Sequence, residues 1–204
     1  LKYNHKDVRN VLERASARET TARVAVGALA KCVLRPFNIR VMGYVAEIGE
    51  VVANHSHLSA EETFARAEVS PVRMADTTAE EQTISLIDQC KKQGDTLGGV
   101  VEVVATGLPP GLGSFVHWDR KLDGRLGHAL LSLQAAKGVE IGLGFGTARL
   151  PGSQVHDEIS FDQKKKFVRH SNNSGGTEGG MSTSEPLRVR VAFKPLSTLM
   201  RPLH

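Results

Sequence analysis

The chain has 204 residues, of which 40% are hydrophobic and 24% are charged, and its formal net charge is +4 at pH 7. This composition is ordinary for a soluble globular protein. No apolar run approaches the ~20 residues that a membrane-spanning helix needs, so a membrane protein is not expected. The mild positive charge indicates anionic ligands, whereas the dispersed basic residues and the single Trp argue against a nucleic-acid partner.

Cys32 and Cys90 lie far apart in the sequence. We expect them to be free thiols in a reducing compartment, which favours a cytoplasmic location. The length allows one sizeable core or two small ones, and we expect residues 1–204 to form a single domain. Because the sequence starts at Leu1 rather than Met and already inside a helical pattern, we expect a cut N-terminus.

The first element predicted is a long helix that ends near Pro36. Its apolar stripe consists of Val8, Val11, Leu12, Ala15, Ala22, Ala25, Val26, Leu29 and Val33. The charged residues Arg18 and Glu19 fall in the middle of this stripe, where burial is costly unless each charge has a partner. The pair is therefore either a satisfied buried ion network, which the spacing alone favours, or a contact for a bound anion at Arg18.

A strand is predicted from Asn38 to Ile48, followed by a less regular stretch. Ser59–Glu62 is a candidate start for a short helix. Thr78–Glu81 is a better capping box, and it predicts a helix that buries Ile84 and Ile87 and stops at Gly94.

The second half of the chain predicts further strands and one helix. Residues 98–105 form a buried-strand pattern that is apolar on both faces except for Glu102, and a Pro/Gly turn cluster follows at 107–113. The spacing predicts a helix over 119–137, with a stripe of Leu122, Leu126, Ala129, Leu130 and Leu133. A strand is expected at 139–145.

Residues 171–186 are rich in Gly, Ser, Asn and Thr and are predicted to form a mobile loop. The alternation in 187–193 then predicts a half-buried strand with Arg188, Arg190 and Lys194 on its polar face. That face is either solvated or turned toward a phosphorylated ligand, since guanidinium and ammonium groups form charge-assisted hydrogen bonds with phosphate.

Other motifs are less informative. The glycines of 175–180 are able to bring backbone amides close to a phosphate or a ring, although such loops are usually only flexible. The Gly144–Gly146 element lacks the third glycine of a dinucleotide fingerprint. His55 and His57 are too isolated to predict a metal site.

Five segments, in order along the chain, resemble signature segments of the chorismate synthase family. They are Glu13-Arg-Ala-Ser-Ala-Arg-Glu-Thr-Thr-Ala-Arg-Val-Ala-Val-Gly27, Gly94-Asp-Thr-Leu-Gly-Gly-Val-Val-Glu102, Gly107-Leu-Pro-Pro-Gly-Leu-Gly-Ser114, Gln134-Ala-Ala-Lys-Gly-Val-Glu-Ile-Gly142, and Asn173-Ser-Gly-Gly-Thr-Glu-Gly-Gly-Met181 running on to Lys194-Pro-Leu-Ser-Thr198. His156-Asp157-Glu158 is similar to a family segment beside the active site, and a structural loop histidine is an equally good interpretation. Five ordered matches make the resemblance specific, although no single segment would.

The resemblance implies an α+β fold, a layered sandwich of sheets and helices, in a homotetramer. It implies a lyase of the shikimate pathway, in aromatic amino-acid biosynthesis, that converts 5-enolpyruvylshikimate 3-phosphate to chorismate and phosphate by 1,4-anti elimination. The family requires FMN in its reduced form, although the reaction has no net redox change. The resemblance implies NADPH as the source of the reducing equivalents, and it leaves open whether the protein itself or a partner reduces the flavin.

The resemblance also implies flavin-binding positions in this chain. They are Ser16, Ala17, Arg18, Gln134, Ala135, Gly179, Lys194, Pro195, Leu196, Ser197 and Thr198. Arg18 would then interrupt the apolar stripe because its guanidinium neutralises the negative charge of the cofactor.

Several family segments have no counterpart in these 204 residues. They include the Gly-Glu-Ser-His segment, the Arg-Pro-Gly-His-Ala-Asp segment and the Arg-Ser-Asp segment, and with them both histidines regarded as catalytic. The sequence thus resembles about half of the family, its middle. Two interpretations follow: part of an FMN-dependent lyase that is inactive as this chain alone, or a non-catalytic flavin-binding or structural fragment.

Overall fold

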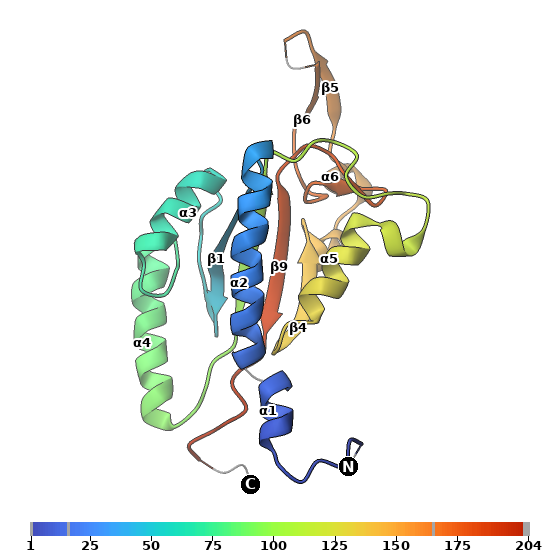
Figure 1. Ribbon diagram of the computed structural model, residues 1–204. Coiled ribbons are helices and arrows are strands. Elements are labelled where there is room, and N and C mark those ends of the chain that lie inside the picture. Colours follow the sequence, from blue (N-terminus) through green and yellow to red (C-terminus); the bar gives the residue numbers. More distant parts are fainter. Residues whose placement is uncertain (1, 16, 165, 202–204) are drawn as a thin grey trace.

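A five-stranded antiparallel sheet organises the chain (Figure 1). The structure is a computed structural model that describes residues 2–15, 17–164 and 166–201. The strand order is β2-β1-β3-β9-β4, so β3 is the central strand. The strands are β1 (Arg40–Ile48), β2 (Val51–Val52), β3 (Gly99–Thr106), β4 (Ala136–Ile141) and β9 (Leu187–Phe193). The strands predicted around β1, β3 and β9 are confirmed.

Helices and two hairpins surround this sheet. The α-helices are α1 (Arg9–Ala15), α2 (Ala17–Leu34), α3 (Ala60–Val69), α4 (Thr77–Gln93), α5 (Leu122–Leu131) and α6 (Gly152–Val155). The 3-10 helices are η1 (Arg35–Phe37), η2 (Trp118–Arg120) and η3 (Gly144–Arg149). The hairpins are β5 (Ile159–Asp162) with β6 (Lys166–Arg169), and β7 (Thr177–Glu178) with β8 (Met181–Ser182). The mixture of helices and an antiparallel sheet confirms the α+β fold class.

The two faces of the sheet bury different cores, as strand alternation requires. On one face, Tyr44 of β1 and Val104 of β3 pack with Ala67 of α3. On the other face, Leu187 and Val189 of β9 form a cluster that the partly buried leucines of α5 cover. The layers of helix, sheet and helix therefore form because each face of the sheet is apolar along part of its width.

The apolar stripe predicted for the long N-terminal helix is not buried in the described residues. Val24, Val26, Leu29 and Val33 of α2 are each more than 60% exposed. At 100° per residue, Val24 and Val26 lie about 200° apart around the helix axis, so the apolar side chains of α2 surround the helix rather than form one stripe. The predicted helix is described as two helices, α1 and α2, with Ser16 between them outside the described residues, and the prediction of its buried face is wrong here.

Helix capping differs from the prediction in an instructive way. The capping box belongs to α3: the Ser59 hydroxyl accepts a hydrogen bond from the Glu62 amide, and the Glu62 carboxylate accepts one from the Ser59 amide. Helix α4 is capped by Asp76, whose carboxylate accepts hydrogen bonds from the two amides at the second and third helical positions. The predicted stop at Gly94 is confirmed, with Gly94 at φ 71°. Ile84 is 38% exposed, so the prediction that it is buried is wrong.

The helix predicted over 119–137 is shorter than expected. It is divided into η2 and α5, and the chain enters β4 at Ala136. Ala135 has φ 66°, which is a left-handed conformation that cannot continue a helix, so the chain reverses there. The strand that follows therefore begins before the predicted residue 139 and ends at Ile141.

The glycine-rich segment 171–186 is packed rather than loose. Gly175, Gly176 and Gly180 are buried, and the segment contains the β7–β8 hairpin. A Cβ at Gly175 would lie 2.2 Å from the backbone nitrogen of Gly142. The glycines are required by close backbone contact, which composition does not reveal, and the prediction of a mobile loop is wrong.

Candidate functional site

The sequence singled out Arg18 and Glu19 as a pair, and the structure gives them different partners. The Arg18 guanidinium is 68% exposed and contacts the carboxylate of Glu13 in α1. Glu19 accepts hydrogen bonds of 2.7 and 2.9 Å from Arg23, one helical turn further along. The buried ion network of this pair, which the spacing favoured, is not formed: Glu19 pairs with Arg23 between partly exposed side chains, and Arg18 lies on the surface. Ser16 is outside the described residues, and Ala17 begins α2.

Gln134 joins the end of α5 to the start of α2. Its side-chain amide nitrogen donates a 2.5 Å hydrogen bond to Glu19, and its oxygen accepts a 3.0 Å hydrogen bond from the Thr20 hydroxyl. Arg23 adds a 2.8 Å hydrogen bond to the Ser132 hydroxyl. The hydrogen bonds from Gln134 and Arg23 hold the pKa of Glu19 below its usual range. Glu19 is therefore a charged acceptor that ties the two segments together.

Ala135 connects this junction to the segment after β9. Its carbonyl accepts a 3.0 Å hydrogen bond from the amide of Lys194. The five residues from Lys194 to Thr198 are all exposed, and the Leu196 carbonyl accepts a 2.7 Å hydrogen bond from the Thr96 hydroxyl. Figure 1 shows α1, the start of α2 and the C-terminal segment at one end of the sheet. Arg18, Gln134, Ala135 and residues 194–198 are therefore brought to the same end of the molecule.

Gly179 lies elsewhere. It forms the turn between β7 and β8, at the opposite end of β9 from Lys194. The seven residues of β9, at ~3.3 Å each, put roughly 20 Å between these ends. A Cβ at Gly179 would meet nothing within 4 Å, so this turn faces open space. Within one chain, Gly179 does not join the other predicted positions.

The end of the sheet offers a donor set suited to an anionic, planar ligand. Arg18 supplies a guanidinium and Lys194 an exposed ammonium, and both can form charge-assisted hydrogen bonds with phosphate. The exposed residues 194–198 lie beside this pair, since the Lys194 amide donates a hydrogen bond to the Ala135 carbonyl, next to Gln134. These groups fit a flavin phosphate and the polar edge of its ring. For this, the Arg18 guanidinium has to leave the Glu13 carboxylate and bind the ligand instead.

The arginines of β9 have internal partners. Arg190 donates a 2.5 Å hydrogen bond to Glu140, and Arg188 approaches Glu102 at 3.5 Å. The structure therefore does not require a phosphorylated ligand to account for this polar face.

Sequence reasoning missed the buried polar network around Glu102. This residue is 7% exposed, accepts a 2.8 Å hydrogen bond from Tyr44 and lies 3.6 Å from His55. Burial alone would raise the pKa of Glu102, but hydrogen bonds with His55 and Tyr44, with the charge of Arg188, lower it. The signal was the single carboxylate in an otherwise apolar strand.

Asp157 was also missed as an organising residue. It is 8% exposed and accepts hydrogen bonds from the Ser171 hydroxyl at 2.5 Å, the Asn173 amide at 2.7 Å and the Ser174 amide at 2.9 Å. Burial opposes its ionisation, but these hydrogen bonds outweigh burial and lower the pKa of Asp157 to about 2. One carboxylate therefore fixes the start of the glycine-rich segment, while the neighbouring His156 is exposed.

Two other site types find no support in the described part of the chain. Among residues 2–15, 17–164 and 166–201, no group of three or more His, Cys, Asp and Glu side chains is placed to hold a metal ion. None of the helices in these ranges is both long enough and apolar enough to cross a membrane.

Comparisons with known proteins give a consistent result. The profile of the family described as "Chorismate synthase" matches residues 1–204. A protein named "Chorismate synthase" from Symbiobacterium thermophilum is 62% identical over 204 residues, which cover 100% of this chain and 52% of the relative. A protein named "Chorismate synthase 2" from a strain of Bacillus cereus is 53% identical over the same length and is also covered to 52%.

A solved structure described as "Crystal Structure of Chorismate Synthase" superposes with a TM-score of 0.90 at 50% identity, covering 95% of this chain and 61% of that chain. The chain thus spans about half the length of the curated relatives it matches. The profile match over all 204 residues shows that the chain belongs to the chorismate synthase family.

Proposed function

We propose that these residues form part of an FMN-dependent chorismate synthase, which converts 5-enolpyruvylshikimate 3-phosphate to chorismate and phosphate by 1,4-anti elimination. The observation that carries the proposal is the whole-length family match at up to 62% identity, together with the superposition on a solved member. The gathering of Arg18, Gln134 and Lys194 at one end of the sheet supports it, because these cationic and amide donors fit an anionic cofactor.

The residues of this chain would bind and orient the reactants. Arg18 and Lys194 would neutralise phosphate charge, and Gln134 would hold a donor near the polar edge of a planar ring. The exposed segment 194–198, anchored through Ala135 and Thr96, would form one wall of the site. Reduced FMN, when bound, would supply electron density to the substrate while phosphate leaves and recover it afterwards.

Three further properties belong to the same proposal. We assign the protein to the cytoplasm and to a homotetramer, and we assign the reducing equivalents for FMN to NADPH. The position of Gly179 supports an assembly of several copies, because the turn lies far from the other flavin positions of its own chain yet faces open space. The alternative is a fragment that binds flavin or supports the fold without catalysis.

The decisive experiment compares two polypeptides under anaerobic conditions with chemically reduced FMN and 5-enolpyruvylshikimate 3-phosphate. The full-length polypeptide encoded by the gene should form chorismate. The 204-residue chain alone should not, because general acid–base groups typically contribute about 10²–10⁴-fold each and the family's catalytic histidines have no counterpart in this sequence. Absence of chorismate formation by the full-length protein would refute the proposal, and turnover by the 204 residues would refute the assignment of proton transfer to other segments.

A further inference from the structure

The side-chain amide of Gln134 is held at both of its ends. Its nitrogen donates a 2.5 Å hydrogen bond to the Glu19 carboxylate, and its oxygen accepts a 3.0 Å hydrogen bond from the Thr20 hydroxyl. Both partners belong to the first turn of α2, whereas Gln134 lies between α5 and β4. The two contacts therefore hold the amide in one of its two possible orientations.

Glu19 determines which orientation the amide adopts. A hydroxyl group can donate or accept a hydrogen bond, so Thr20 is satisfied by either end of the amide. An ionised carboxylate can only accept, so Glu19 requires the nitrogen of Gln134 on its side. The hydrogen bonds from Gln134 and Arg23 lower the pKa of Glu19, which keeps the carboxylate ionised at neutral pH.

Arg23 holds this carboxylate in place from the other side. Its Nε donates to both oxygens of Glu19, at 2.7 and 2.9 Å, and a second nitrogen donates a 2.8 Å hydrogen bond to the Ser132 hydroxyl. Ser132 in turn donates a 2.6 Å hydrogen bond to the Ala129 carbonyl of α5. These contacts oppose rotation of the Glu19 carboxylate away from Gln134.

The nitrogen of Gln134 carries a second hydrogen, which is directed away from Glu19 because the two N–H bonds of a primary amide diverge. In the part of the chain that the structure describes, this second N–H has no hydrogen-bond acceptor. Gln134 is partly buried, and a shielded N–H without an acceptor costs free energy. The second N–H is therefore available to a ligand.

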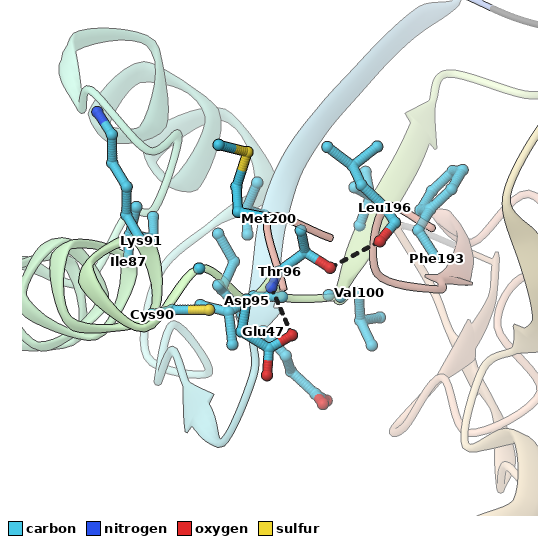
Figure 2. Close-up of a pocket in the computed structure, with 17 residues that line it drawn as sticks. Glu47, Ile87, Cys90, Lys91, Asp95, Thr96, Val100, Phe193, Leu196 and Met200 are labelled. Atoms are coloured by element: carbon cyan, nitrogen blue, oxygen red, sulfur yellow. Dashed lines mark hydrogen bonds between the residues drawn. The ribbon is translucent and has the colours of Figure 1, made fainter. Parts of the chain in front are cut away.

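The amide also lies next to the segment that carries predicted flavin positions. The carbonyl of Ala135 accepts a 3.0 Å hydrogen bond from the Lys194 amide. The Thr96 hydroxyl donates a 2.7 Å hydrogen bond to the Leu196 carbonyl, drawn as a dashed line in Figure 2. The segment is thus attached at two points, and the first of them is the residue that follows Gln134.

We propose that Glu19 is a positioning residue of this site: its carboxylate fixes the Gln134 amide so that the second N–H is presented to a hydrogen-bond acceptor on the bound ligand. The inference rests on the proposed function, in which this ligand is FMN. One edge of a flavin ring carries carbonyl oxygens and ring nitrogens that accept hydrogen bonds. Glu19 itself does not touch the ligand and acts only through Gln134.

Glu19→Gln tests the orientation directly, because it keeps the shape of the side chain. Arg23 can only donate, so it would bind the oxygen of the new amide and leave the new nitrogen facing Gln134. The Gln134 amide would then reverse to offer its oxygen, and the ligand would lose its donor. We expect the full-length Glu19→Gln protein to bind FMN about 5-fold to 10-fold more weakly than wild type in a fluorescence titration, which corresponds to the loss of one hydrogen bond.

Glu19→Ala separates positioning from a general loss of structure. It leaves the Gln134 amide able to adopt both orientations, so FMN affinity should fall only about twofold, because half of the molecules still present the N–H. Urea denaturation should give the reverse order, with Glu19→Ala less stable than Glu19→Gln, since alanine removes every contact of the side chain. Glu68→Gln is the matched control: Glu68 forms an exposed ion pair with Arg73, and its loss should leave FMN affinity unchanged.

A Gln134→Ala background shows whether Glu19 acts through Gln134. In this background Glu19→Gln should cause no further loss of FMN affinity, because the group that it orients is absent. An equal effect in both backgrounds, or a larger loss of affinity for Glu19→Ala than for Glu19→Gln, would overturn the inference. FMN binding that Glu19→Gln does not weaken would refute this inference alone, whereas a wild-type full-length protein that does not bind FMN would refute the proposed function and the inference together.

Discussion

Tyr44 and Glu102 lie opposite each other in the β1–β3 register, and the Tyr44 hydroxyl donates a 2.8 Å hydrogen bond to the Glu102 carboxylate. Burial and the adjacent carboxylate raise the pKa of Tyr44, so the phenol stays protonated and keeps donating. The carboxylate is anchored at the centre of the sheet, where its loss of hydration has to be offset by such donors.

Tyr44→Phe should therefore lower the free energy of unfolding by about 1–3 kcal/mol, because a buried carboxylate oxygen loses its donor. Tyr3→Phe is the matched control, since Tyr3 is 69% exposed. Urea denaturation measures both. An equal effect of Tyr44→Phe in a Glu102→Gln background would contradict the mechanism, because the carboxylate would then not be the cause.

Asp157→Asn should lower the free energy of unfolding by about 1–3 kcal/mol, since the new amide nitrogen faces backbone N–H donors that need an acceptor. Glu158→Gln, at the exposed neighbouring position, should have little effect. The region 171–186 should become the first site of limited proteolysis in the Asp157 variant. Equal protease resistance in both variants would show that Asp157 does not hold this segment.

The same carboxylate predicts a pH dependence. The pKa of Asp157 is lowered in the folded state from 3.8 to about 2, so its stabilising contribution is complete above pH 4 and is lost as the pH falls toward 2. The stability difference between wild type and Asp157→Asn should therefore shrink over this interval. Thermal denaturation of both proteins between pH 5 and pH 2.5 tests it, and a constant difference would argue against a lowered pKa.

The capping assignments can be tested by a pair of substitutions. Ser59→Ala should lower the free energy of unfolding by about 1 kcal/mol, because the Glu62 amide in the first turn of α3 loses its acceptor. Thr78→Ala should change it little, since Asp76 and not Thr78 caps α4. If chemical denaturation shows a larger loss of stability for Thr78→Ala than for Ser59→Ala, the capping box predicted at 78–81 is correct after all.

Arg18→Ala should weaken flavin binding by the full-length protein by roughly 1.5–3 kcal/mol, the usual contribution of a charge-assisted hydrogen bond. Lys31→Ala, an exposed cation near the other end of α2, is the control and should leave affinity unchanged. Glu19→Ala should lower stability more than affinity, because Glu19 contacts Gln134 and Arg23. Fluorescence titration of flavin separates the three variants, and an unchanged dissociation constant for Arg18→Ala would remove it from the site.

Sequence patterns predicted the strands better than the ends of helices and the packing. The alternation of Leu187 to Phe193 and the apolar run around Glu102 identified two central strands, because strand burial leaves a direct period in the sequence. Capping depends on which side chain meets which amide, and both Ser59–Glu62 and Thr78–Glu81 satisfied the pattern. The pattern alone does not show which capping box forms, because Asp76 competes with Thr78 for the first free amides of α4.

The site residues, too, were predicted from the sequence only in part. Spacing identified Arg18 and Glu19 as unusual, and family resemblance grouped Arg18, Gln134 and Lys194, which the structure brings to one end of the sheet. Spacing could not show that Glu19 pairs with Gln134, since this contact joins residues 115 positions apart. Composition likewise misjudged residues 171–186, because glycine permits tight packing as readily as flexibility.

The strand order also determines how the chain can assemble. Strand β9 lies between β3 and β4 in the sheet, although it follows both in the sequence. The edges of β3 and β4 that face β9 can therefore pair only after β9 has been synthesised. Each of these pairings closes a long loop, and closing long loops slows folding. During synthesis, β3 and β4 leave the ribosome before β9 does, so these edges are unpaired at first. Until Leu187–Phe193 has emerged, the unpaired edges make the nascent chain prone to association with other chains.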